Sequence, residues 1–156
     1  MDEAQFTELA ERYRDLLWHI AYTMLHSEQD AADAAQEALL RAWRARNTFR
    51  GEASAKTWLT RILVNVCRSM RRRRVIFSPL TGLEEAPASA DNAPLHDALA
   101  KLPTGLRMPL VLHYLEGFSV EEVARTLSIP SGTVKSRLYR GRRELAQVLD
   151  KEDVDW

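Results

Sequence analysis

Apolar residues recur at three- and four-residue intervals along the first part of the chain, from Phe6 to Met24. An α-helix completes a turn every 3.6 residues, so this spacing gathers the apolar side chains on one face of an amphipathic helix. No stretch alternates apolar and polar side chains for long enough to predict a β-strand. The pattern therefore predicts an all-α protein.

Two further helices are predicted in the N-terminal half. Ser27 is a suitable N-cap for a strongly helix-forming segment with acidic residues in its early turns and arginines near its end, as the helix dipole favours. Ser54 is a second suitable cap, and the helix after it leads into Arg71–Arg74. Its apolar residues share one face: Trp58, Ile62, Val66 and Met70. These helices predict a first domain over residues 1–74.

The helical period is lost over residues 75–94, which contain three prolines and no basic side chain. Such a segment buries little surface, so we predict a flexible linker. Periodicity returns over residues 95–150 and predicts a second small helical domain, with residues 151–156 as an acidic tail. Pro109 interrupts one of its helices and predicts a bend or a later start there, whereas Gly117 suits a helix C-cap.

The second domain contains a predicted helix-turn-helix. Ser119 and Glu122 have the spacing of a capping box, and Phe118 and Val123 that of a hydrophobic staple. The helix that begins there is followed by the turn SIPSG and by a second helix, TVKSRLYRGRRELAQVL. Two helices joined by such a short turn are typical of DNA-binding proteins, in which the second helix enters the major groove.

That second helix carries five basic side chains between Lys135 and Arg143 and no acidic one, although the chain as a whole has 22 basic and 22 acidic residues. One side is apolar and is expected to pack on the first helix, through Val134 and Leu138. Arg137 and Arg142 lie at the boundary between the apolar side and the opposite side, where they are expected to contact phosphates or acids such as Glu144. The side chains predicted to bind duplex DNA are Lys135, Ser136, Tyr139, Arg140 and Arg143.

The segment LPTGLRMPLVLHYLEGFSVEEVARTLSIPSGTVKSRLYRGRRELAQVL resembles the C-terminal domain of extracytoplasmic-function (ECF) sigma factors, a group of the sigma-70 family. In the N-terminal half, DAADAAQEALLRAWR is similar to the family's helix that grips RNA polymerase, and FRGEASAKTWLTRILVNVCRSMRRRR to its promoter-melting segment. The resemblance implies an alternative RNA polymerase sigma factor that binds core polymerase and directs promoter recognition and transcription initiation.

The resemblance also implies roles for particular residues. Promoter opening requires a pocket for an extruded base and cations along the strand. For Phe49 we favour a role in that pocket, and for Trp58 ordinary core packing; Arg71–Arg74 would follow duplex phosphates. The implied polymerase-binding residues are Asp33, Gln36, Glu37, Leu40 and Arg44. The residues implied to bind and melt the downstream promoter element are Phe49, Arg50, Gly51, Glu52, Ala53, Ser54, Arg61 and Asn65.

Other function classes lack support in the sequence. There is no glycine-rich phosphate loop, nucleophile elbow or zinc motif, so we predict neither an enzyme nor a bound cofactor. The four histidines are scattered without ligand spacing, so no metal site is expected, and Cys67 is predicted to be a small buried hydrophobe.

No apolar run approaches the roughly 20 residues that cross a bilayer, so we expect a cytoplasmic protein without membrane insertion. The expected partners are core RNA polymerase and promoter DNA, and the resemblance adds an anti-sigma factor. The alternative hypothesis is a helix-turn-helix transcriptional regulator whose N-terminal helices form a sensing or dimerisation domain.

Overall fold

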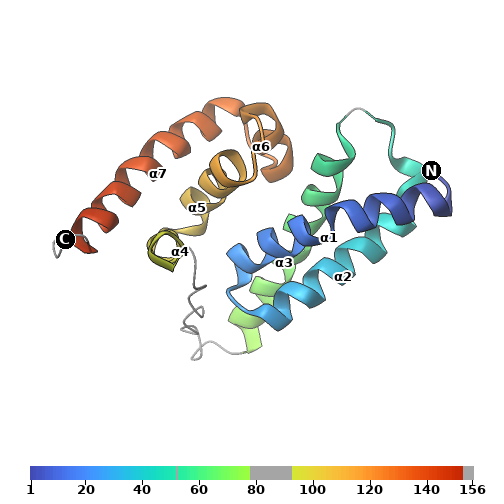
Figure 1. Ribbon diagram of the computed structural model, residues 1–156, viewed down its shortest axis with the longest axis horizontal. Helices are drawn as coiled ribbons and strands as arrows, with labels where there is room; N and C mark the ends of the chain where they lie inside the picture. The colour runs from blue at the N-terminus through green and yellow to red at the C-terminus, as the bar shows by residue number, and fades with distance from the viewer. Residues whose placement is uncertain (52, 78–92, 153–156) are drawn as a thin grey trace. The chain divides into compact units, whose positions relative to one another are not determined.

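A computed structural model describes residues 1–51, 53–77 and 93–152 of the chain (Figure 1). These residues form helices and connecting turns without a strand, which confirms the predicted all-α fold. The chain splits into two compact units, Met1–Glu84 and Glu85–Trp156. In the part of the chain that the structure describes, no helix has the combination of length and apolar character needed to span a bilayer.

The N-terminal unit consists of α1 (Glu3–Leu25), α2 (Glu28–Arg44) and α3 (Ala55–Phe77), each of which contacts the other two. Because only two residues connect α1 to α2, these helices pack antiparallel (Figure 1). The α2 side of the core is made of alanines, which lack bulk and so allow the neighbouring helices to lie close. The buried alanines of α2 are Ala31, Ala34, Ala35, Ala38 and Ala42.

Both N-caps predicted in this unit are confirmed. The Ser27 hydroxyl accepts a hydrogen bond from the Asp30 amide at 3.2 Å, and the Ser54 hydroxyl accepts one from the Thr57 amide at 3.1 Å. Helix α3 continues to Phe77, beyond the boundary expected at Arg74, since Pro79 is the first helix-breaking residue after the arginines. The predicted linker, 75–94, lies mostly outside the described residues.

The C-terminal unit consists of α4 (Ala93–Ala100), α5 (Thr104–Leu110), the π-helical turn η2 (Val111–Leu115), α6 (Val120–Leu127) and α7 (Ser131–Glu152). Helix α7 contacts α4, α5 and α6 (Figure 1). The largest fully buried side chain in this unit is Phe118, and Leu112, Val123 and Val134 are also fully buried. The long helix α7 is thereby held along one side, and its other side stays exposed.

A later helix start, one of the two effects predicted for Pro109, is not observed. Helix α5 begins at Thr104 and contains Pro109. The hydrogen-bond pattern instead widens to that of a π-helix at Val111, where the Glu116 amide donates to the Val111 carbonyl at 3.0 Å. A proline has no N–H for the carbonyl four residues before it, so the regular ladder is already interrupted at this point. Gly117 has a φ of 75°, as its predicted C-cap position requires.

The helix-turn-helix forms as predicted. The Ser119 hydroxyl accepts from the Glu122 amide, and the Glu122 carboxylate accepts from the Ser119 amide, both at 3.0 Å. Phe118 and Val123, the expected staple, are 1% and 0% exposed. Helix α6 ends at Leu127, and its C-cap, Ser128, adopts the left-handed conformation with a φ of 58°.

Candidate nucleic-acid interface and docking groove

Helix α7 separates its apolar and polar side chains as the sequence predicts. Val134 and Leu138 are 0% and 4% exposed, and Gly141 is buried as well. A Cβ atom at Gly141 would lie 3.0 Å from Leu110 Cδ1 and 3.3 Å from the Leu106 carbonyl oxygen, so a glycine lets α5 approach α7 closely. The opposite face of α7 brings together five exposed side chains, those of Lys135, Ser136, Tyr139, Arg140 and Arg143.

The basic side chains between Lys135 and Arg143 form no ion pair with any described residue. Two of them instead contact tyrosines. Arg143 Nη1 donates to the Tyr139 hydroxyl at 3.4 Å, and Arg142 Nη1 donates to the Tyr114 hydroxyl at 2.7 Å. A tyrosine hydroxyl accepts a hydrogen bond but does not replace a carboxylate, so neither guanidinium is paired with a carboxylate among the described residues. This leaves α7 with a strongly cationic exposed face.

The chain between α2 and α3 contains the 3₁₀ turn η1 (Arg46–Thr48) and Gly51, whose φ of 75° is a conformation that glycine adopts without strain. The ring of Phe49 lies 4.9 Å from that of Trp58, tilted by 40°, and both side chains are half-buried. The sequence suggested a pocket role for Phe49 and core packing for Trp58. In the structure they form one aromatic pair at the start of α3.

Arg61 and Asn65 are exposed and lie four residues apart on α3, so they share one side of the helix. Of the predicted melting loop, Arg50, Gly51 and Ser54 are exposed and Ala53 is half-buried, whereas Glu52 lies outside the described residues. The exposed residues Arg71–Arg73 follow within the same helix, which continues past them. The described members of the predicted melting set thus lie in the loop between η1 and α3 and on the exposed side of α3.

The predicted polymerase-binding residues share the side of α2 that lies opposite its buried alanines. Asp33, Gln36 and Arg44 are exposed, Leu40 is 45% exposed, and Glu37 is half-buried. Glu37 also accepts a hydrogen bond from Arg41 Nε at 3.1 Å and forms an ion pair with it. This surface mixes acidic, basic, amide and apolar groups, unlike the cationic face of α7.

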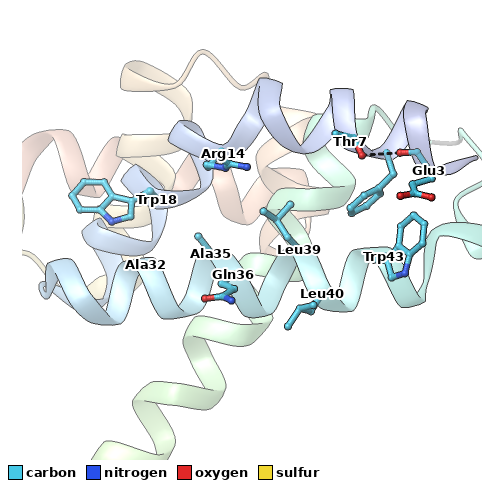
Figure 2. A pocket seen from close by; sticks show the side chains of 11 residues that line it. Glu3, Thr7, Arg14, Trp18, Ala32, Ala35, Gln36, Leu39, Leu40 and Trp43 are labelled. Carbon is cyan, nitrogen blue, oxygen red and sulfur yellow. Dashed lines mark hydrogen bonds between the residues drawn. The ribbon is translucent and has the colours of Figure 1, made fainter.

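An apolar groove of about 580 Å³ runs between α1 and α2 (Figure 2). Figure 2 shows Trp18 and Trp43 towards its two ends, with Gln36, Leu39 and Leu40 between them. It adjoins the predicted polymerase-binding surface, since Gln36 and Leu40 belong to both. The residues that line it are Glu3, Phe6, Thr7, Arg14, Trp18, Ala32, Ala35, Gln36, Leu39, Leu40 and Trp43.

Aromatic contacts shape both ends of the groove. Phe6 meets Trp43 edge to face at 5.2 Å, and Trp18 stacks on Tyr22 at 5.3 Å. The Arg46 guanidinium lies 3.6 Å from the centroid of the Trp43 ring, so this end of the groove adjoins η1. Sequence reasoning missed the groove. The sequence feature that could have indicated the groove is the presence of aromatic residues beside polar ones on α1 and α2, which a short connection makes neighbours.

Burial shifts the pKa of two side chains described in the N-terminal unit, those of Cys67 and Tyr22. Burial raises the pKa of the Cys67 thiol to about 12, and the nearby Arg71 charge lowers it only in part. Cys67 is 0% exposed, which confirms the predicted buried hydrophobe. Burial, and secondly the Glu28 carboxylate, raises the pKa of Tyr22. No group of three or more His, Cys, Asp and Glu side chains among the described residues is arranged to hold a metal ion.

Comparison with known proteins identifies both halves of the chain. Residues 9–75 match the family model of sigma-70 region 2, and residues 93–145 match that of sigma-70 region 4. The ECF RNA polymerase sigma factor SigM of Mycobacterium tuberculosis is 36% identical over 155 residues, which cover 95% of this chain and 79% of SigM. The RNA polymerase sigma-H factor of Pseudomonas aeruginosa is 32% identical in a comparison that covers 95% of this chain and 88% of that factor.

A solved structure agrees with these relatives. The sigma factor RpoE from Bartonella quintana, co-crystallised with the anti-sigma factor NepR, matches with a TM-score of 0.81 at 27% identity, over 97% of this chain and 99% of that one. This chain therefore belongs to the ECF RNA polymerase sigma factors of the sigma-70 family. The predicted family and function are confirmed: it is an alternative sigma factor that acts in transcription initiation. The alternative of a regulator with an N-terminal sensing domain is not favoured, because region 2 accounts for that half.

Proposed function

We propose that the two halves divide promoter recognition between them, with residues 95–150 binding the upstream promoter element as duplex DNA and residues 1–74 docking on core polymerase and melting the downstream element. Residues 75–94 act as the linker, and the acidic tail, 151–156, has no assigned part. The observation that carries this proposal is the exposed face of α7, on which five predicted DNA-binding residues lie together without a carboxylate partner among the described residues.

In the upstream complex, α7 lies in the major groove with its N-terminal part nearest the base edges. Arg140 and Lys135 are long enough to donate to guanine O6 and N7, and Ser136 and Tyr139 supply shorter polar contacts. The buried side of α7 fixes the direction of these side chains, because Leu138 and Gly141 pack against the rest of the unit. Recognition then depends on a rigid helix rather than on a loop.

In the downstream complex, the loop before α3 receives an extruded base. The Phe49–Trp58 pair offers an aromatic surface, and the backbone turn at Gly51 leaves space beside it. Asn65 both donates and accepts hydrogen bonds, which suits recognition of a base edge, and Arg61 supplies a cation for the strand backbone. The exposed arginines at 71–73 follow the adjoining duplex phosphates.

In the polymerase complex, α2 and the adjoining groove dock on a helical hairpin of core polymerase. The groove takes apolar side chains, and the mixed polar surface around Gln36 and Arg44 forms the rim. The similar RpoE was crystallised with an anti-sigma factor, which supports proposing such an inhibitor for this chain. In this role the protein catalyses no covalent reaction, and its place is with the polymerase and chromosome in the cytoplasm.

Run-off transcription tests the proposal. Purified core polymerase is supplied with a genomic promoter library, with and without this protein, and transcripts are mapped. We expect a defined set of start sites that depends on the protein. Footprinting of the same promoters by the protein alone is the companion measurement, because an ordinary regulator would protect DNA without polymerase. Core polymerase that initiates identically in both reactions would overturn the proposal.

A further inference from the structure

Tyr114 and Arg142 make a contact that the helix-turn-helix itself does not require. Tyr114 belongs to the π-helical turn η2 and is 54% exposed. Its hydroxyl accepts a hydrogen bond of 2.7 Å from Arg142 Nη1, across 28 positions of sequence, and the guanidinium carbon lies 6.0 Å from the centre of the ring. Both side chains are exposed, so the contact orders two groups that would otherwise rotate freely in water.

The contact orients the arginine without neutralising it. A guanidinium has five N–H donors, and Tyr114 takes one of them. Among the described residues, no carboxylate pairs with Arg142. The next residue repeats the arrangement, since Arg143 donates to the hydroxyl of Tyr139, which is 55% exposed. Two consecutive arginines are thus each held by an exposed tyrosine, and both keep their charge and most of their donors.

Arg142 lies at the edge of the face proposed to bind duplex DNA. It follows Lys135 by seven residues, which is about 20° short of two full turns of an α-helix, so both side chains project from the same edge. Helix α7 in a major groove would have its central face at the base edges and its flanks at the phosphate backbones. A planar guanidinium matches two phosphate oxygens at once.

We propose that Arg142 binds a phosphate of the DNA backbone beside the upstream element, and that Tyr114 is the residue that positions it. The DNA interface then extends beyond the helix-turn-helix onto η2. This inference rests on the proposed binding of upstream duplex by α7. DNA is favoured over a protein partner because the charge of Arg142 is uncompensated and continuous with an acid-free cationic face, whereas the mixed charges of α2 suit a protein surface.

The test is the salt dependence of DNA binding by holoenzyme reconstituted from core polymerase and the full chain. The duplexes carry a promoter from the run-off experiment with its upstream element intact or scrambled. We expect Arg142→Gln to reduce the slope of log affinity against log salt concentration by about 1 on both duplexes, as loss of one phosphate contact predicts. Lys101→Gln removes the same charge from the turn after α4 and should leave the slope unchanged.

Tyr114→Phe keeps the ring and removes the hydroxyl that accepts from Arg142. We expect a smaller reduction of the slope in the same direction, and no further change when Tyr114→Phe is added to Arg142→Gln, because the hydroxyl then has nothing to position. A merely structural tyrosine would instead weaken binding equally in both backgrounds. Thermal unfolding of each variant confirms that the exposed substitutions leave the fold intact.

Three results would overturn the inference. The first is an unchanged salt slope for Arg142→Gln, and the second is an equal effect of Tyr114→Phe with and without Arg142. The third is that Arg142→Gln or Tyr114→Phe prevents the protein from assembling with core polymerase in the absence of DNA. The surface around Tyr114 and Arg142 would then be a protein contact. A wild-type holoenzyme that does not prefer the intact upstream element would instead count against the proposed function, and the slope on non-specific duplex would still test the phosphate contact.

Discussion

Helices α2 and α7 both present a row of exposed polar side chains, but in the part of the chain that the structure describes the exposed charges are partly paired on α2 and unpaired on α7. On α2, Glu37 and Arg41 pair across one turn, and Leu40 interrupts the polar surface. On α7, the basic residues between Lys135 and Arg143 have no carboxylate partner among the described residues, and two of them donate hydrogen bonds to tyrosine hydroxyls. Neutralised and mixed charge suits a protein partner, whereas a phosphate backbone requires unpaired positive charge.

The two helices also differ in the side that they bury. Helix α2 buries small alanines, so its neighbours lie close. The groove shared with α1 runs along the edge of this packed side. Helix α7 buries the larger Val134 and Leu138, with Gly141 as its close contact to α5. The cationic face of α7 therefore depends on a few large side chains, and single substitutions should separate its packing from its DNA binding.

The largest effect is expected from Leu138→Ala. This side chain is 4% exposed, and its truncation leaves a cavity that should destabilise the C-terminal unit by about 2–5 kcal/mol. Urea unfolding measures the change, and DNA binding through α7 should be lost with the fold. Tyr139→Ala, one position further along and 55% exposed, is the control and should change stability by less than about 0.5 kcal/mol. Equal destabilisation by both would contradict the assigned faces of α7.

The second prediction concerns promoter melting by the N-terminal half. Phe49→Ala and Asn65→Ala each remove one of the proposed contacts with an extruded base, so the unstacking cost of a few kcal/mol should no longer be offset. Both holoenzymes should still footprint the upstream element but start poorly on duplex promoters. A template with a pre-opened bubble should restore part of their activity. Permanganate reactivity of unpaired thymines measures the melting, and normal reactivity on duplex DNA would remove these residues from the mechanism.

Arg140→Ala tests sequence recognition by α7. Loss of a contact to a base edge should weaken holoenzyme binding to the intact upstream element by about 1–3 kcal/mol, with a much smaller effect on a scrambled element. The control is Arg44→Ala on α2, which should weaken assembly with core polymerase and leave this discrimination unchanged. Equal loss on both duplexes would mean that Arg140 contacts phosphate instead of a base.

Features that depend on neighbouring residues were predictable from the sequence. The Ser119–Glu122 capping box, the Ser27 and Ser54 caps and the two faces of α7 all follow from spacings within one helix, and the structure contains each of them. The burial of Cys67 was likewise predicted, because a single cysteine without a Cys or His neighbour at ligand spacing can form neither an internal disulfide nor a good metal site. In each case a few positions of sequence determine the local geometry.

Features that join distant segments were not predictable in the same way. The Tyr114–Arg142 contact and the α1–α2 groove depend on the angle and register at which two helices pack, which a single helical pattern does not specify. The pairing of Phe49 with Trp58 depends on the path of the loop between two helices. The π-helical turn after Pro109 is a third case, since the proline indicates an interruption but not its form.

The smallest expected effect is on the free energy of unfolding, when a charge is removed from α2 or from α7. Glu37→Gln breaks the ion pair with Arg41, in which both side chains are about two-fifths exposed, and should lower the free energy of unfolding by only about 0.3–0.5 kcal/mol. Arg140→Gln on α7 removes a charge that has like-charged neighbours and no ion pair with a described residue, so it should leave stability unchanged or raise it slightly.

Salt distinguishes these two charge effects from changes in packing. The stability changes of Glu37→Gln and Arg140→Gln should both shrink towards zero at about 1 M salt, where the screening length is about 3 Å. Urea unfolding of the two variants and the wild type at low and high salt measures the differences. A loss of stability in Arg140→Gln comparable to that in Glu37→Gln would show that α7 has a compensating acid after all, and the distinction between a paired docking face and an unpaired phosphate-binding face would fail.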